Sequence, residues 1–256
     1  FDLSTLKGIV TMGSPLERFA CIRYQKVLTP NIFNGYGTTE TFWNTFLRPF
    51  DLPENAGTAG SSCVDDDVRV VKIHEGRRSE PDDLVTKDGH DIGEVIICSP
   101  AKSPYRYVNN DAETESKYYK DFIYTGDLAT WDENQFLTIV GRRDDMIISS
   151  GENIYPTQIE EVLNSNPKVK DCMVTSVPDK IRGQVVTAYI VREDDSLTAE
   201  ELDDYCKKNL NMANFKRPRF YRFVSHIPFN ATGKKLHGKL REIAHEDLKN
   251  GLLYQV

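Results

Sequence analysis

The sequence predicts a fold in two parts, a larger α/β segment followed by a small α+β domain. Up to about residue 140, short apolar runs alternate with turn-forming residues, a pattern typical of strands. Beyond residue 141, helical and strand-like patterns alternate closely. The charged run Gly-Arg-Arg-Asp-Asp at 141–145 lies between the two patterns. We therefore expect domains at residues 1–141 and 142–256.

The first part is expected to contain short strands joined by turns. Each strand is an apolar run bounded by residues that favour turns. We expect these strands at residues 8–13, 68–73, 94–98 and 136–140. Turns are expected at 87–90 and 132–134, and residues 51–62, rich in Pro, Gly, Ser and Ala, predict a loop.

The second part is expected to alternate helices and strands. Apolar residues at helical spacing predict helices at residues 156–164, 198–210 and 236–250. Strands are expected at residues 172–177, 185–191 and 219–228. Thr198 and Glu201 have the spacing of a capping box at the start of the second helix. The buried side of that helix is expected to comprise Leu202, Tyr205, Cys206 and Leu210.

Composition and charge limit the classes of protein to which the chain can belong. Its 32 Lys and Arg against 39 Asp and Glu give a net charge of −7, which argues against general affinity for nucleic acid or anionic lipid. The apolar runs are too short for a membrane span. Five cysteines without a CxxC pair suggest reduced thiols in a cytoplasmic protein. The chain begins without Met in fold-like sequence, so we expect a piece of a longer protein.

Four separated stretches carry candidate chemistry. The first, Asn-Gly-Tyr-Gly-Thr-Thr-Glu at 34–40, offers glycines that admit a flat ligand, and oxygen ligands for phosphate and a hard metal ion. The second joins Tyr-Thr-Gly-Asp at 124–127 to the run at 141–145. Its Asp, following a Gly turn, can accept from ribose hydroxyls, and its Arg can bind phosphate or ribose oxygens. Each piece alone is also consistent with a plain turn.

The other two stretches lie in the second part. Residues 146–156 form an apolar strand that turns through Gly into a helix with Pro in its first turn, as an ordinary strand–turn–helix also does. Residues 228–236, Pro-Phe-Asn-Ala-Thr-Gly-Lys-Lys-Leu, lack the first Gly and the final Ser or Thr of a Walker A loop, which excludes a P-loop nucleotidase. Residues 216–241 contain eight Lys and Arg and no acid, and most of these cations are expected on a solvated face.

Together and in this order, the stretches resemble the adenylate-forming acyl-CoA synthetases, a family that includes luciferases and peptide-synthetase adenylation domains. The matching motifs are Tyr-Gly-Thr-Thr-Glu, Tyr-Thr-Gly-Asp, Gly-Arg-Arg-Asp-Asp-Met-Ile, Ser-Gly-Glu-Asn-Ile-Tyr-Pro and Gly-Lys. The resemblance covers the whole chain but only the C-terminal half of a family member. It implies the end of the large domain, a sheet with a distorted barrel-like subdomain, followed by a small mobile lid. The family's upstream phosphate loop is absent, so this chain alone is expected to be inactive.

The resemblance also implies roles for residues of the first part. Gly13-Ser14-Pro15 and Tyr36-Gly37 would flank the adenine of ATP or AMP. Thr39 would contact the α-phosphate, and Glu40 would hold Mg²⁺. Asp127 would bind the ribose hydroxyls.

Further roles follow for the boundary and the second part. Arg142 would lie close to ribose and phosphate, and Asp144 matches the hinge of the mobile domain, within 142–145. Ser150-Gly151-Glu152 matches the loop that lines the pantetheine tunnel for coenzyme A. Lys234 matches the lysine that acts in adenylation, whereas Lys235 has no assigned role.

The implied activity is that of an acid–thiol ligase. A carboxylic acid and MgATP would form an acyl-adenylate, and the acyl group would pass to coenzyme A. Residues 145–149 and 214–218 look most like benzoate- and chlorobenzoate-type CoA ligases, so an aryl or medium-sized acid is expected. Thr41-Phe42-Trp43 is read either as an aromatic wall of the acyl pocket or as plain core.

Two alternative functions stay open. One is an adenylation domain that hands its acyl group to a carrier protein, although nothing after Leu240 resembles a carrier domain. The other is a catalytically silent nucleotide-binding or interaction module.

Because the first part would lack sheet partners, it is expected to expose apolar surface or strand edges and to be able to pair as a homodimer.

Overall fold

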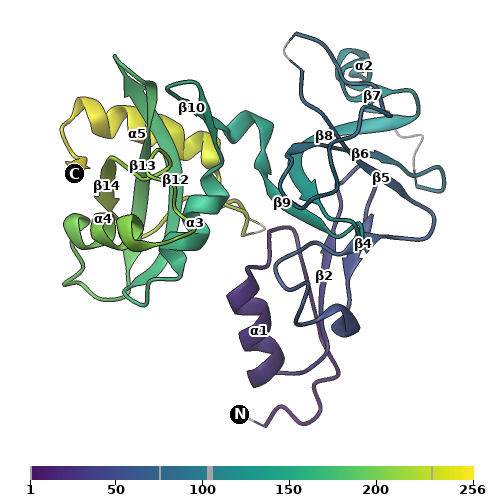
Figure 1. Ribbon diagram of the computed structural model, residues 1–256, viewed down its shortest axis with the longest axis horizontal. Helices are drawn as coiled ribbons and strands as arrows, with labels where there is room; N and C mark the ends of the chain where they lie inside the picture. The colour runs from purple at the N-terminus through teal and green to yellow at the C-terminus, as the bar shows by residue number, and fades with distance from the viewer. Residues whose placement is uncertain (1, 75, 103–105, 232) are drawn as a thin grey trace. The chain divides into compact units, whose positions relative to one another are not determined.

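A computed structural model describes residues 2–74, 76–102, 106–231 and 233–256. The chain divides into two compact units, Phe1–Arg143 and Asp144–Val256 (Figure 1). The division falls within the charged run at 141–145, next to the expected boundary. The α/β and α+β fold class is confirmed, and each unit has cores of its own.

The first unit begins with a four-stranded sheet in the order β1-β2-β3-β4. Its strands are β1 (Ile9–Met12), β2 (Ile32–Tyr36), β3 (Thr45–Leu47) and β4 (Ser61–Ser62). Helix α1 (Arg18–Val27) connects the parallel pair β1 and β2. Because Met12 lies beside Gly35 in that pair, the loops that follow both strands leave the same edge of the sheet.

A second, antiparallel sheet completes the first unit, in the order β5-β6-β8-β7 with β9 paired to β8. Its strands are β5 (Asp67–Val71), β6 (Gly93–Cys98), β7 (Tyr118–Tyr119), β8 (Phe122–Trp131) and β9 (Leu137–Arg142). Short helices η1 (Pro49–Asp51) and α2 (Asp111–Lys117) lie in the connections. Strand β6 is buried on both faces, since Val95 and Ile97 pack into one core and Ile96 into another.

Strand β8 corrects one expectation. Gly126 and Asp127, read as a turn and the residue after it, lie in the middle of this ten-residue strand. Gly126 has φ of +73°, and the β6–β8 register shifts between Glu94 and Ile96. A glycine in the left-handed conformation with a register shift is a β-bulge, so the chain bends here without leaving the sheet.

The second unit is a sheet covered by helices on both faces. The sheet has the order β12 (Val169–Asp179), β13 (Gly183–Arg192), β14 (Phe220–Phe223) and β15 (Tyr254–Gln255). Helices α3 (Pro156–Asn164) and α4 (Ala199–Lys208) pack on one face and α5 (His237–Lys249) on the other (Figure 1). Alternate residues of β12 face the two cores: Cys172 and Val174 face α3 and α4, and Met173 faces α5.

A hairpin precedes this sheet. After the short helix η2 (Arg143–Asp145), strands β10 (Ile147–Ser149) and β11 (Glu152–Ile154) pair antiparallel. The expected strand–turn–helix therefore contains a second strand before α3, which does begin at Pro156. The capping box of Thr198 and Glu201 is confirmed.

Several element boundaries differ from expectation. Helix α4 ends at Lys208, so Leu210 is fully exposed instead of buried. Strand β14 ends at Phe223 and does not continue to residue 228. Within the described part of the chain, no helix has the length and apolar character needed to cross a membrane.

Candidate active site

Asp127 is the centre of a hydrogen-bonded group in the first unit. The Tyr36 hydroxyl donates to its Oδ2 at 2.8 Å, and Arg142 Nη1 donates to its Oδ1 at 2.8 Å. Tyr36 ends β2, while Asp127 and Arg142 lie opposite each other on β8 and β9. The fold thus brings together three residues predicted to bind the nucleotide, although they are separated by up to 106 positions in the chain.

The bulge at Gly126 shapes this group. A Cβ on residue 126 would lie 3.1 Å from Arg142 Nη2, so glycine leaves room for the guanidinium as well as permitting the positive φ. The Gly126 N–H donates to Glu94 Oε1 at 3.1 Å, and Arg143 pairs with the other oxygen of Glu94 at 3.2 Å. Glu94, which the sequence reading missed, therefore supports the bulge.

The protonation of Tyr36 and the free lone pairs of Asp127 suit this group to a ligand with two neighbouring hydroxyls. Burial, followed by the charge of Asp127, raises the pKa of Tyr36 well above its ordinary value, so the phenol remains a donor. A carboxylate has about four lone-pair positions, and Tyr36 and Arg142 occupy two of them. Asp127, whose side chain is 13% exposed, can therefore accept two further hydrogen bonds.

Glu40 has a partner of its own. The Tyr107 hydroxyl donates to Glu40 Oε1 at 2.6 Å. Burial acts to raise the pKa of Glu40, but hydrogen bonds from Tyr107 and neighbouring groups outweigh it and lower the pKa. The ionised side chain has the chemistry of an oxygen ligand for a hard ion such as Mg²⁺. Among the described residues there is no group of three or more His, Cys, Asp or Glu side chains that could hold a metal ion.

The loop that carries Thr39 and Glu40 requires glycine at its start. A Cβ on Gly37 would lie 1.4 Å from the carbonyl oxygen of Phe42, which itself has φ of +58°. Phe42 N–H closes the loop on the Thr38 carbonyl at 2.8 Å. Thr39 itself is exposed at the turn.

Buried polar residues hold the far end of the same loop. Asn44 receives a 2.6 Å hydrogen bond from Thr41 and donates to the buried Asp66 at 3.1 Å. Lys102 pairs with Asp66 at 2.5 Å. Asn44, Asp66 and Lys102 were not predicted from the sequence, because Asp66 and Lys102 reach this loop from separate segments of the chain.

Gly13, Ser14 and Pro15 follow β1 and are exposed. Gly13 has φ of +86°, with open space where a Cβ would stand. The β1–β2 register puts this segment at the same sheet edge as Tyr36 and Gly37. Their predicted place beside the adenine is compatible with that geometry.

In the second unit the predicted coenzyme A loop is the tip of the β10–β11 hairpin. Ser149 pairs with Glu152, which leaves Ser150 and Gly151 as a two-residue turn with φ of +53° and +83°. Positive φ at both positions is the type I′ pattern. The Ser150 N–H donates to the Arg182 carbonyl at 2.9 Å, and residues 150–152 are exposed. At the predicted hinge, the Asp144 carbonyl accepts from Arg241 at 2.9 Å.

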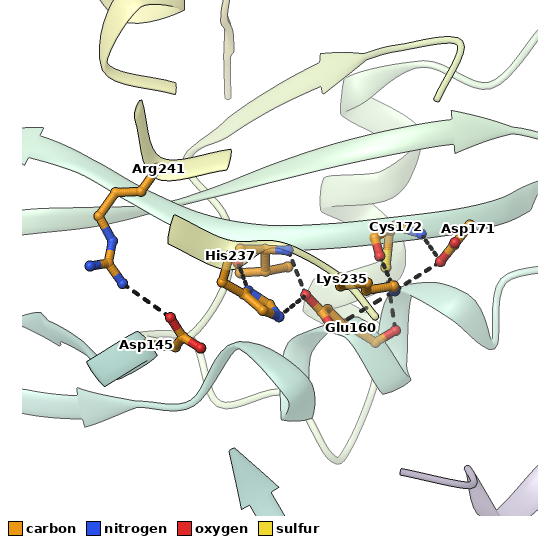
Figure 2. Close-up of polar contacts among 8 residues, drawn as sticks. Asp145, Glu160, Asp171, Cys172, Lys235, His237 and Arg241 are labelled. Atoms are coloured by element: carbon orange, nitrogen blue, oxygen red, sulfur yellow. Dashed lines mark hydrogen bonds and ion pairs between the residues drawn. The ribbon is translucent and has the colours of Figure 1, made fainter. Parts of the chain in front are cut away.

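The side chains of the neighbouring Lys234 and Lys235 lie in different environments. Lys234 is exposed on a turn, as expected. Lys235 is not part of a solvated face, because its ammonium lies 2.9 Å from Asp171 Oδ1 and 3.9 Å from Glu160 Oε2, and donates to the Cys172 carbonyl (Figure 2). Thr232, part of the same motif, lies outside the described residues.

Comparison with known proteins settles the family. Residues 1–103 match the family described as AMP-binding enzyme, and residues 158–234 match the AMP-binding enzyme C-terminal domain. A long-chain-fatty-acid–CoA ligase from Yersinia pestis is 33% identical over 98% of this chain. The chain belongs to the AMP-binding family of adenylate-forming enzymes. It covers 42% of the length of the Yersinia ligase, and thus less than half of that AMP-binding relative.

Solved AMP-binding enzymes share the fold of this chain. The o-succinylbenzoate CoA synthetase from Bacillus subtilis, in complex with ATP and a magnesium ion, is 31% identical with a TM-score of 0.78, over 91% of this chain and 46% of its own. An anthranilate CoA ligase in complex with anthranoyl-AMP is 27% identical with a TM-score of 0.82, over 97% of this chain and 46% of its own. The predicted family is therefore confirmed.

Proposed function

We propose that this chain supplies the carboxyl-terminal part of the machinery of an ATP-dependent acid–thiol ligase. The acid would be activated as an acyl-adenylate and then transferred to coenzyme A. The observation that carries the proposal is Asp127, held by Tyr36 and Arg142 with lone pairs free for a ribose diol. The relatives, which include CoA ligases and a synthetase solved with ATP and magnesium, support it.

The nucleotide would be held by the first unit. Asp127 accepts from the ribose hydroxyls, and Arg142, 36% exposed, offers its remaining N–H groups to ribose or phosphate oxygens. The loops after β1 and β2, which contain Gly13-Ser14-Pro15 and Tyr36-Gly37, flank the adenine. Thr39 contacts the α-phosphate. Glu40 would hold Mg²⁺, which supplies positive charge to the phosphate oxygens when bound.

Charge governs the first step. A carboxylate oxygen of the acid attacks the α-phosphorus of ATP, and the bond to the leaving pyrophosphate breaks with its electron pair. Two anionic groups must approach each other, so a cation aimed at the developing charge lowers the barrier. Lys234, exposed on its turn, is the residue that we assign to this role.

The second step needs other residues of the second unit. The coenzyme A sulfur attacks the acyl carbonyl carbon, and AMP leaves with the electron pair of the broken bond. We assign the hairpin tip Ser150-Gly151-Glu152 to the pantetheine arm and Asp144 to the hinge that exchanges this tip for Lys234.

The test uses a fusion, because the relatives extend well beyond the part that this chain matches. The amino-terminal part of the Bacillus subtilis synthetase would precede this chain, and pyrophosphate release would be measured with o-succinylbenzoate. Lys234→Ala should lower adenylation by about 10²–10³. It should leave thioester formation from supplied acyl-adenylate nearly unchanged, while Asp144→Pro, which fixes φ, should show the opposite bias.

Lys239→Ala is the matched control, an exposed lysine on α5. Lys235 cannot serve as a control, since it is half-buried and forms ion pairs with Asp171 and Glu160. Equal losses with Lys234→Ala and Lys239→Ala would contradict the assignment of the catalytic lysine. The unfused chain should release no pyrophosphate, and acid-dependent release by it would refute the expected inactivity.

The acid and the acceptor are further points of the proposal. We favour an aryl or medium-sized acid, because Phe42 and Trp43 line an apolar pocket with Cys63 and Lys102. A panel of aryl, medium-chain and long-chain acids tests this choice. Replacing coenzyme A by a carrier protein tests the carrier alternative, and titration calorimetry with AMP separates both from a silent module, which would bind no nucleotide.

We also propose a reducing, cytoplasmic setting and self-association. The five cysteines, all within the described residues, form no disulfide. Val10 and Met12, on one face of β1, are 52% and 54% exposed, and a second copy could cover these apolar side chains. Sedimentation of the purified chain distinguishes a homodimer from a monomer.

A further inference from the structure

Lys235 is the residue next to the proposed catalytic lysine, yet it has the opposite environment. Its side chain is 23% exposed and reaches Asp171, Glu160 and the Cys172 carbonyl (Figure 2). Residue 235 pairs antiparallel with Phe229, so this arm is locally extended. Adjacent side chains of an extended segment point to opposite sides. With Lys235 directed into the unit, Lys234 is directed away from it.

The turn between the two arms is tightly bonded. Asn230 N–H donates to the Lys234 carbonyl at 2.9 Å, and Lys234 N–H donates to Asn230 Oδ1 at 2.8 Å. Gly233 N–H closes on the Asn230 carbonyl at 3.0 Å. These hydrogen bonds tie Gly233 and Lys234 to Asn230, so the direction of Lys234 depends on what holds the base of the turn.

Lys235 ties that base to a buried carboxylate. Glu160 on α3 accepts from the Val174 N–H at 2.7 Å, and His237 Nε2 lies 4.0 Å from it. Burial raises the pKa of Glu160, against the opposing charges of Lys235 and His237. Burial acts to lower the pKa of Lys235, but Glu160 and Asp171 outweigh it and raise the pKa, so the ammonium remains charged.

We propose that Lys235, with Glu160 and Asp171, is a positioning anchor that aims Lys234 into the reaction. This inference rests on the proposed function. The anchor links helix α3, strand β12 and the turn, three segments that are up to 75 residues apart in sequence. It touches no substrate, and acts only by fixing the direction of the neighbouring side chain.

The first test measures order in the full 256-residue chain by ¹⁵N relaxation. In the unsubstituted chain, Gly233 and Lys234 amides should have order parameters near the rigid value of about 0.85, and Lys235→Met should lower them below about 0.6. Lys239→Met is the control, and should change neither. Unchanged order in Lys235→Met would overturn the anchor.

Loss of Lys235 removes one of the two cations beside the buried Glu160 and thereby destabilises the second unit. The double variant Glu160→Gln/Lys235→Met removes both charges, so stability recovers while the tether stays absent. Order at Lys234 should remain low in this double variant. Recovery of order along with stability would show that the cluster is only structural.

The second test uses the fusion described above and compares the half-reactions. The double variant should lower adenylation by about 10–100-fold through misplacement of Lys234, with thioester formation from supplied acyl-adenylate little changed. Equal losses in both half-reactions would overturn the anchor. If Lys234→Ala does not lower adenylation, the role proposed for Lys234 is wrong. If Lys234→Ala lowers adenylation but the double variant does not, only the positioning role of Lys235 is wrong.

Discussion

In the first unit Asp127 already accepts hydrogen bonds from Tyr36 and Arg142, whereas in the second unit Lys234 lies on an exposed turn beside the half-buried, ion-paired Lys235. The carboxylate of Asp127 is thus held in place by hydrogen bonds before any ligand binds. The ammonium of Lys234 is exposed, and only the adjacent Lys235 is fixed by ion pairs. Both units thus use buried polar contacts, in the first unit at the candidate residue itself and in the second at its neighbour.

The difference agrees with the roles proposed for the two groups. Holding a nucleotide through two half-reactions favours a preorganised acceptor, because ordering it during binding would reduce affinity. A lysine that serves one half-reaction must leave for the other, and a permanent partner for its charge would oppose departure. Anchoring the adjacent residue fixes direction without pairing the working ammonium.

The largest expected effect contrasts the adjacent lysines. Lys235→Met should destabilise the second unit by about 3 kcal/mol, because it removes the ammonium beside the buried Glu160, which then keeps only the Val174 N–H and His237. Lys234→Met should stay within about 0.5 kcal/mol, as is usual for exposed positions. Hydrogen exchange of the β12 and β13 amides measures both. Similar losses of stability in the two variants would contradict the different roles of Lys234 and Lys235.

A smaller effect is expected at the loop of Glu40. Gly37→Ala should cost about 2–3 kcal/mol in the first unit, because the Cβ would collide with the Phe42 carbonyl and force the loop to move. Both tryptophans, Trp43 and Trp131, lie in that unit, so their fluorescence during urea unfolding reports on it. Val64→Ala, at a side chain of the same unit that is 97% exposed, is the control and should change stability by less than about 0.5 kcal/mol. A harmless Gly37→Ala would mean that the loop is not held as described.

Local patterns predicted much of this structure. The apolar run of β6, helix α3 with its Pro156 start, and the cap at Thr198 are properties of a few neighbouring residues, and the structure confirms them. Helix α1 was missed because only Cys21 on it is buried, which leaves no apolar stripe to detect. Strand β8 was missed because Gly126, which bends it, looks the same in sequence as a turn glycine.

The candidate site divides in the same way. Motifs predicted Asp127, Arg142 and Glu40 as candidates, but not the residues that orient them. Tyr107 is 67 positions from Glu40, and Lys235 is 64 positions from Asp171. Such partners are chosen by the fold, and no spacing rule along one strand or helix connects them.

The preorganised group can be broken at its centre. Asp127→Asn keeps the shape but removes the charge that pairs with Arg142, and should cost about 2 kcal/mol in the first unit, the range for hydrogen bonds to charged groups. AMP affinity, measured by calorimetry, should fall as well. Asp82→Asn, at a carboxylate that is 93% exposed, should change stability by less than about 1 kcal/mol and leave AMP binding intact. If AMP binds Asp127→Asn normally, the ribose assignment is wrong.

The smallest expected effect concerns Glu40. It tests whether its partner Tyr107 lowers the pKa of Glu40 as well as fixing its position. Tyr107→Phe removes the 2.6 Å hydrogen bond, so the pKa of Glu40 should rise toward its ordinary value. Because the folded pKa lies below the unfolded one, the contribution to stability is present above the ordinary carboxyl pKa and is lost as pH falls through the folded pKa. The stability difference between the two proteins should therefore be largest near neutral pH, at about 1 kcal/mol, and shrink in acid.

An NMR titration of the Glu40 carboxyl carbon measures the pKa directly, with Tyr24→Phe on the exposed face of α1 as the control. Glu40 remains ionised at neutral pH in either protein, so Mg²⁺ binding there should change little, and weaken only on the acid side. An unchanged pKa in Tyr107→Phe would show that Tyr107 positions Glu40 without tuning it. Glu40 would then resemble Lys234, whose neighbour sets direction and leaves the charge alone.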